Sequence, residues 1–314
     1  MGGRKLEKIK QNPFVKKVGF NRIVLCCVLL LMYGLFCALT GGSFAGMNRI
    51  MSALNYAYFL GFLSLGVTFV IATGQIDFLY WTGYVLLCTY LRLYTDNTWN
   101  FHAGCNPDRI LVGFAFGLFN GYLVAYWSVP SFITSMASMN IAKGLASVYT
   151  KTQSVSWPQA ADPDNGWFRN LISYKGFPVG LVIFLAAAVI CGIILYNTKP
   201  GRYILCLGSN SEAVRLSGVN TKKWRMLAYV ICGVLVGIGA IFFVGAYTTV
   251  QPGYGDQYNN EAIAGCVMGG TSMVGGLASI GGTVIGVFII SLLQQGIMAF
   301  GLGKGQQMII TGLI

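Results

Sequence analysis

The sequence predicts an all-α, polytopic membrane protein of about ten transmembrane helices. Hydrophobic residues make up 55% of its 314 residues and charged residues only 10%, whereas soluble domains carry about 25% charged residues. Several apolar runs approach or exceed the roughly 20 residues that cross a bilayer as a helix. In addition, 13 of the 21 Lys and Arg residues fall in two segments, 4–22 and 199–225, as the positive-inside rule requires of segments that face the cytoplasm.

The apolar runs set the order of the expected helices and loops. We expect one membrane domain over residues 1–314, in which ten passes start inside and return the segment 197–225 to the cytoplasm with the basic N-terminus 1–21. The loops 95–108 and 150–177 then face outward, and the chain is a multi-pass protein of the cytoplasmic membrane. A cleaved secretory signal is the alternative for the first 40 residues, but the apolar run is longer than a typical signal core. The expected helices cover residues 22–40, 51–73, 76–94, 109–128, 131–149, 178–196, 226–248, 261–281, 282–300 and 306 onward.

A weak internal repeat suggests how these helices are arranged. Segments 120–133 and 295–309 share an amide-glycine start and a polar break, and Asp77 and Glu261 each stand at the expected start of a helix. Five helices per half then make an inverted repeat of five plus five, an architecture that places the substrate path of transporters at the repeat interface. Chance similarity between apolar segments is the alternative, since the two offsets, 175 and 184 residues, differ.

The sequence contains no recognisable motif for catalysis or nucleotide binding. Lys304 lies in "GLGKGQQ", which lacks the upstream glycine and the following Ser or Thr of a phosphate-binding loop. The single histidine, His102, excludes most hydrolase schemes, and in its loop with Cys105 we expect solvated side chains and no metal. We therefore expect a protein that is not an enzyme and binds no cofactor, so that ATP, if used, is hydrolysed by another chain. The basic segments lack the interleaved aromatic residues of a nucleic-acid groove.

Three polar, glycine-containing breaks interrupt the apolar runs: residues 72–77, 251–257 and 268–276. In lipid, an interrupted helix leaves backbone N–H and C=O groups unpaired, which is tolerated only where protein or a water-filled cavity satisfies them. The breaks therefore indicate broken helices that line a path. Close helix packing is the alternative, and we prefer it for the small-xxx-small glycines at positions 113, 117, 121, 282 and 286.

Polar residues in the membrane segments are amides and hydroxyls more often than charged groups. A path for a neutral, polyhydroxylated solute needs that chemistry, because amides both donate and accept hydrogen bonds; an ion path needs more charges. Interhelical hydrogen bonding is the alternative for each residue. For Asp77 and Glu261 we prefer a helix cap over a proton-coupling pair, because the free N–H groups of a helix start stabilise a carboxylate. The candidate path residues are Asn55, Gln75, Asp77, Asn120, Asn140, Glu261, Thr271, Ser272 and Gln294.

The stretch "GSNSEAVRLSGVN", residues 208–220, is a polar interruption with the signals of a short helix. Ser209 and Glu212 have the spacing of a capping box, and Gly218 is placed to end the helix. Two turns are too few to be stable alone. With the apolar Ala213 and Leu216 and the polar Glu212 and Arg215, this helix is predicted to dock a partner. A helix lying at the lipid headgroups is the alternative.

This stretch resembles the coupling-loop signature of the permease subunits of ribose- and galactoside-type ATP-binding-cassette (ABC) importers, in the branched-chain amino acid and ribose permease superfamily. The matching residues are Gly208, Ser209, Asn210, Ala213, Arg215, Ser217, Gly218, Val219 and Asn220. The segment "EAIAGCVMGGTSMVGG", residues 261–276, is similar to a second segment of that family. The family usually has a glycine where Gln75 stands, so an unusual substrate choice is expected if that region lines the path.

The resemblance implies a permease that moves a monosaccharide with the help of partners. These are two cytoplasmic ABC ATPase subunits, a second permease in a homodimer or heterodimer, and an extracellular solute-binding protein, with membrane lipid around them. Glu212, Ala213, Arg215 and Leu216 would touch the ATPase. A furanosyl signalling compound or a branched-chain amino acid is the alternative solute. Outside the family, the alternatives are a proton-coupled carrier working alone and a structural scaffold.

Overall fold

A computed structural model describes residues 20–77, 108–156, 169, 172–173, 176–247, 249–250, 256–302 and 304–313. A short 3-10 turn, η1 (Ser43–Ala45), follows the first described helix, and β1 (Val155–Ser156) pairs with β2 (Thr249–Val250) in a small antiparallel ribbon. The expected all-α, polytopic fold is confirmed. The helices are α3 (Phe20–Leu39), α4 (Met47–Ala72), α6 (Asp108–Tyr126), α7 (Ser131–Thr150), α8 (Val179–Asn197), α9 (Lys199–Leu216), α10 (Thr221–Ala246), α11 (Asp256–Met268), α12 (Ile280–Ala299) and α13 (Lys304–Leu313).

Five of the described helices are long and apolar enough to cross a membrane: α3, α4, α8, α10 and α12. The pass expected over 76–94 lies outside the described residues. The pass expected over 261–281 is wrong, because α11 ends at Met268. Its 13 residues rise about 20 Å, which is short of the roughly 30 Å hydrocarbon core. The glycines at 269 and 270 stop the helix, and residues 269–279 form a loop before α12.

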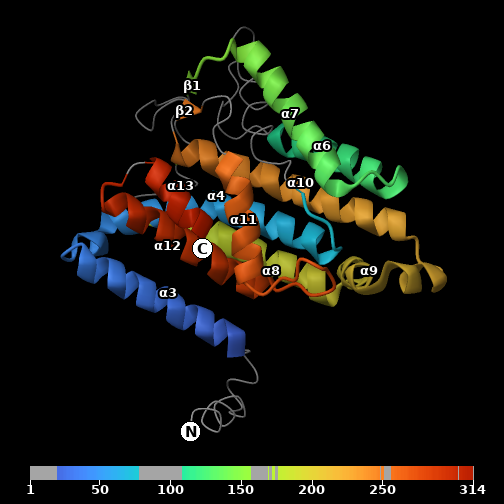
Figure 1. Cartoon of the computed structure of the whole chain (residues 1–314), viewed down its shortest axis with the longest axis horizontal. Helices are drawn as coiled ribbons and strands as arrows, with labels where there is room; N and C mark the ends of the chain where they lie inside the picture. The colour runs from blue at the N-terminus through green and yellow to red at the C-terminus, as the bar shows by residue number, and fades with distance from the viewer. Residues whose placement is uncertain are drawn as a thin grey trace.

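Helix α4 is the centre of the bundle. From Tyr56 to Ala72 every one of its residues is buried, as expected for a helix that is apolar all round. It lies against α10, α12, α11 and α8, and Figure 1 shows it enclosed by them. Aromatic rings fill its contact with α10, where Phe59 meets Phe243 edge-on and Phe62 stacks on Phe242. By contrast, α3 is largely exposed and rests on α12 at the margin of the bundle.

Glycines allow α6 and α10 to cross closely, as the small-xxx-small spacing predicts. A Cβ atom added to Gly117 would lie 2.6 Å from the carbonyl oxygen of Tyr229, and one added to Gly233 would lie 2.3 Å from the carbonyl oxygen of Gly113. These are backbone contacts, so a neighbouring side chain cannot turn away to make room. Glycine is therefore required here by the approach of two helices.

We predict that Gly117→Ala destabilises the protein by about 1–3 kcal/mol, because the new methyl group must push α6 away from α10. Thermal unfolding of the purified protein in detergent measures the effect as a lowered midpoint. Gly144→Ala in α7 is the matched control, because a Cβ there meets nothing within 4 Å. Equal midpoints for the two variants would contradict the assignment of this crossing.

Candidate functional site: a polar cavity and a kinked helix

A polar cavity of about 440 Å³ lies where one end of α4 meets α11, α12 and α13. This volume is in the range of small-molecule sites. The described residues that line the cavity carry no charge. Amide and phenol groups predominate among them: Asn55, Tyr56, Tyr247, Gln257, Tyr258, Gln294, Gln295 and Gln307.

Helix geometry explains why α4 presents a polar face here. Ser52, Asn55 and Tyr56 are spaced three and four residues apart, so they fall on one side of the helix and all line the cavity. Gln294 and Gln295 approach from α12. The side-chain oxygen Oδ1 of Asn55 is buried and has no hydrogen-bond partner among the described residues. A buried acceptor of this kind favours the binding of a solute that carries a hydrogen-bond donor.

Glu261 holds three helices together beside the cavity. It lies on α11 and is buried, and its carboxylate accepts hydrogen bonds from the Tyr56 hydroxyl of α4 and, at 2.7 Å, from the Gln294 amide nitrogen of α12. The expected helix cap is therefore wrong for Glu261. The helix begins at Asp256, five residues earlier, so the carboxylate pairs with side chains of neighbouring helices instead of the N–H groups of a helix start.

The structure separates the other candidate path residues from this cavity. Asn120 of α6 accepts a hydrogen bond from Ser138 of α7 at 2.7 Å, and Asn140 is exposed on α7. Gln75 and the buried Asp77 follow the other end of α4, while Thr271 and Ser272 lie in the loop after α11.

Of the candidate path residues, Asn55 and Gln294 line this cavity and Glu261 lies beside it, whereas the lining residues Tyr247, Tyr258 and Gln307 are not among the candidates. Tyr247 and Tyr258 flank the polar break at 251–257, and that break was the available signal. Tyrosine is also common at membrane interfaces, so spacing in the sequence does not distinguish the two situations. His102 and Cys105 lie outside the described residues.

Several backbone groups of the loop after α11 have hydrogen-bond partners in the loop or in α4. The amide of Ser272 donates to the carbonyl of Leu277 at 2.9 Å, and the amide of Gly276 donates to the carbonyl of Ala72 at 3.0 Å. The Thr271 hydroxyl accepts from the Ser279 amide at 3.3 Å. These bonds compensate for the interrupted helix, and one of them ties the loop to the end of α4.

The same loop also touches α9. A Cβ atom added to Gly208 would lie 2.0 Å from the carbonyl oxygen of Ala72 and 2.3 Å from the amide nitrogen of Gly276. A Cβ atom on Gly275 would lie 2.9 Å from the Cα atom of Gly208. We call this meeting of Ala72, Gly208, Gly275 and Gly276 the glycine contact. It joins the end of α4, the loop after α11 and the middle of α9 through main-chain atoms.

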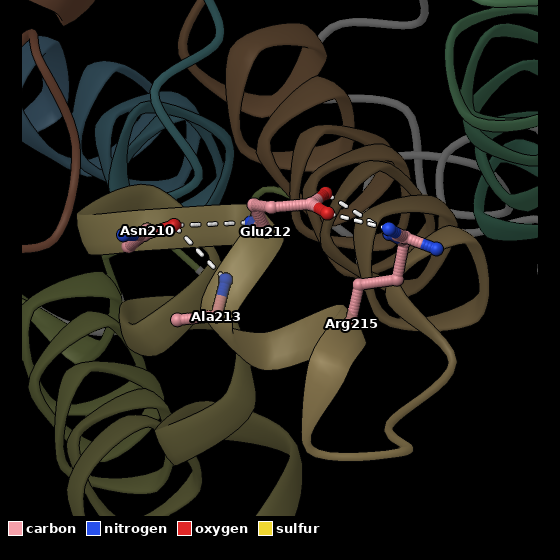
Figure 2. Close-up of polar contacts among 4 residues, drawn as sticks. All are labelled: Asn210, Glu212, Ala213 and Arg215. Carbon is pink, nitrogen blue, oxygen red and sulfur yellow. Dashed lines mark hydrogen bonds and ion pairs between the residues drawn. The ribbon is translucent and has the colours of Figure 1, made fainter.

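Two residues beyond the glycine contact, α9 kinks at Asn210, whose φ of −159° and ψ of 96° are not helical. Its side-chain oxygen accepts hydrogen bonds from the amides of Glu212 at 3.1 Å and Ala213 at 3.0 Å (Figure 2). The expected capping box is therefore wrong: Asn210 caps the short helix, and the Ser209 hydroxyl donates to the Leu205 carbonyl instead.

The short helix after the kink presents an exposed tip. The Arg215 guanidinium donates to the Glu212 carboxylate at 2.9 Å (Figure 2), and Leu216 is 74% exposed. Gly218, with φ of +79°, ends the helix as expected. A hydrogen bond from Arg215 lowers the pKa of Glu212 below its usual range, so this ion pair is lost only as the pH falls through that lowered pKa.

Comparisons with known proteins point to one family. A family model described as "Branched-chain amino acid transport system / permease component" matches residues 49–314. The ribose import permease protein RbsC of Escherichia coli (strain K12) is 31% identical over 87% of this chain and 84% of that protein. The xylose transport system permease protein XylH of Haemophilus influenzae is 25% identical over 95% of each chain. The galactose/methyl galactoside import permease protein MglC of Escherichia coli (strain K12) is 31% identical over 65% of this chain and 61% of that protein. No solved structure matches.

We predict that Gly208→Ala opens the glycine contact, because its methyl group would overlap the Ala72 carbonyl. The amide of Gly276, which donates to that carbonyl, should then exchange its hydrogen at least about tenfold faster, the equivalent of about 1.4 kcal/mol. Hydrogen exchange read by mass spectrometry measures the change. Gly192→Ala in α8 meets nothing within 4 Å and serves as the control. Unchanged exchange in both variants would show that the contact is dispensable.

Proposed function

The chain belongs to the family of branched-chain amino acid transport system permease components, and on that premise we propose that it is the transmembrane subunit of an ABC importer for a monosaccharide. The polar cavity carries this proposal. The chain is a multi-pass membrane protein, and its family consists of permease subunits that are not themselves enzymes. The cavity gives such a permease a place for a small solute among its helices.

The chemistry of the cavity favours a neutral sugar as the solute. Its amides both donate and accept hydrogen bonds, as the hydroxyl groups of a sugar do, and its tyrosine rings offer flat apolar faces beside polar groups. A branched-chain amino acid carries an ammonium and a carboxylate group, and the described lining has no charged residue to bind either. The related ribose, xylose and galactose permeases support the same solute class.

The exposed tip of α9 supports docking of a cytoplasmic ABC ATPase. An exposed leucine beside a charged pair has the composition of a small interface centre with a polar rim. We propose that the ATPase binds Glu212, Ala213, Arg215 and Leu216 and hydrolyses the ATP itself, so this chain binds none. The segment 197–225 and the N-terminus then face the cytoplasm, and a solute-binding protein delivers the sugar on the other side. A second permease completes the pair that two ATPase subunits require.

We predict that the permease accumulates sugar in proteoliposomes only together with its ATPase, its binding protein and ATP. The measurement is uptake of radiolabelled ribose, xylose and galactose against a concentration gradient. Omission of ATP is the control. Concentrative uptake by the permease alone would overturn the proposal in favour of a secondary carrier.

Substitution of the exposed tip should separate docking from folding. We predict that Leu216→Asp and Arg215→Glu each weaken ATPase association by at least about tenfold, because burial of one leucine contributes about 1.5–3 kcal/mol. Copurification from detergent measures association, and membrane insertion should be unchanged. Arg202→Glu reverses an exposed charge on α9 before the kink and should leave association intact. Full association of the two tip variants would rule out docking at this helix.

A further inference from the structure

We infer that Glu261 is a positioning residue that fixes the hydrogen-bonding direction of the cavity wall, so that the wall accepts hydrogen bonds from solute hydroxyl groups. The inference rests on the proposed function, because it assigns a role to a residue beside the sugar cavity. Glu261 itself does not line the cavity. Both of its hydrogen-bond partners, Tyr56 and Gln294, do.

The direction of the two bonds follows from the chemistry of the groups. The Tyr56 hydroxyl and the Gln294 amide nitrogen are the donors of these two bonds, and the two carboxyl oxygens of Glu261 are the acceptors. A tyrosine hydroxyl has a single hydrogen, and here that hydrogen is given to Glu261. The Tyr56 oxygen can therefore offer a solute only its lone pairs. The neighbouring Asn55 adds a second buried acceptor without a described partner, so this part of the wall selects for donors.

The position of Glu261 favours this role over a simple interhelical bond. Its two oxygen atoms join α4 and α12 to α11, and a group held from three helices has a defined orientation. An ionisable residue inside a membrane bundle is costly and is usually found at functional sites. A neutral glutamine would be less costly to bury, but its amide has one oxygen and one NH2 group, so it could not accept from Tyr56 and Gln294 at its two ends as the carboxyl group does.

That difference gives a direct test with Glu261→Gln. An amide has one acceptor and one donor group, so one of the two partners must reverse and present the opposite polarity to the cavity. The test compares import of the parent sugar with import of its deoxyfluoro analogues, one for each hydroxyl position. A fluorine replaces the hydroxyl at similar size but cannot donate a hydrogen bond.

For the unaltered permease, reconstituted with its ATPase and binding protein, we expect at least one analogue to be imported at least about tenfold less efficiently than the parent sugar. In Glu261→Gln the import efficiency of the parent sugar should exceed that of the same analogue by less than about threefold. The midpoint of thermal unfolding of this variant should be close to that of the control. The control is Ser291→Ala, which removes a buried hydrogen bond from α12 to the Ala53 carbonyl of α4; neither of these two residues lines the cavity. Because the binding protein is the same in every arm, a change in the ratio belongs to the permease.

The outcomes separate this inference from the proposed function. If the unaltered transporter imports none of the sugars, the proposed function fails. If it imports sugar and Glu261→Gln keeps the fluorine penalty unchanged, the inference is overturned. Should Glu261→Gln not fold, Tyr56→Phe decides, because it removes one of the two acceptors of this part of the wall and should lower the penalty at the hydroxyl position that Tyr56 binds. Penalties that Tyr56→Phe leaves unchanged at every hydroxyl position overturn the inference as well.

Discussion

An interrupted helix leaves backbone amides and carbonyls without helical partners, and the loop between α11 and α12 supplies partners for several of them through contacts of its own. Its amides and carbonyls pair within the loop and with the end of α4, where the Ala72 carbonyl accepts from Gly276. Such pairing needs backbones in direct contact, and glycine is the residue that permits it. Gly208 of α9 enters the same contact. The hydrogen bond from Gly276 to Ala72 therefore lies where α9 contacts the loop between α11 and α12.

Helix α11 is short because the loop begins directly after Met268, and the first residues of this helix line the cavity. Since the helix stops at Met268, it reaches only part of the way through the bundle. Its other end lies beside the cavity, where Glu261 meets side chains from α4 and α12. One short helix therefore has the polar cavity near its first turns and the glycine contact beyond its last. In a transporter, a helix in that position can carry movement between a docked partner and a solute.

Much of this arrangement could be predicted from the sequence, and the failures have physical causes. Apolar runs and basic clusters predicted the all-α fold, and the polar breaks predicted interrupted helices. The sequence predicts Ser209 as the cap of the short helix, whereas Asn210 is the cap in the structure. Both residue types are good caps, and the non-helical backbone at Asn210 makes that residue the cap. Glu261 was misplaced because a helix can begin at Asp256 or at Glu261. Only packing against Tyr56 and Gln294 places the Glu261 carboxylate in the interior, and side-chain contacts between distant segments leave no local pattern.

The glycine contact contains only main-chain atoms, and this has a consequence for how related transporters diverge. A joint without side chains has no rotamers to adjust, so its stiffness does not depend on which residues surround the solute. Substitutions in the cavity can then change which sugar is bound without altering the contact that links the loop after α11 to α9, the helix proposed to bind the ATPase. The residues that bind the solute can therefore change during evolution while the glycine contact stays the same.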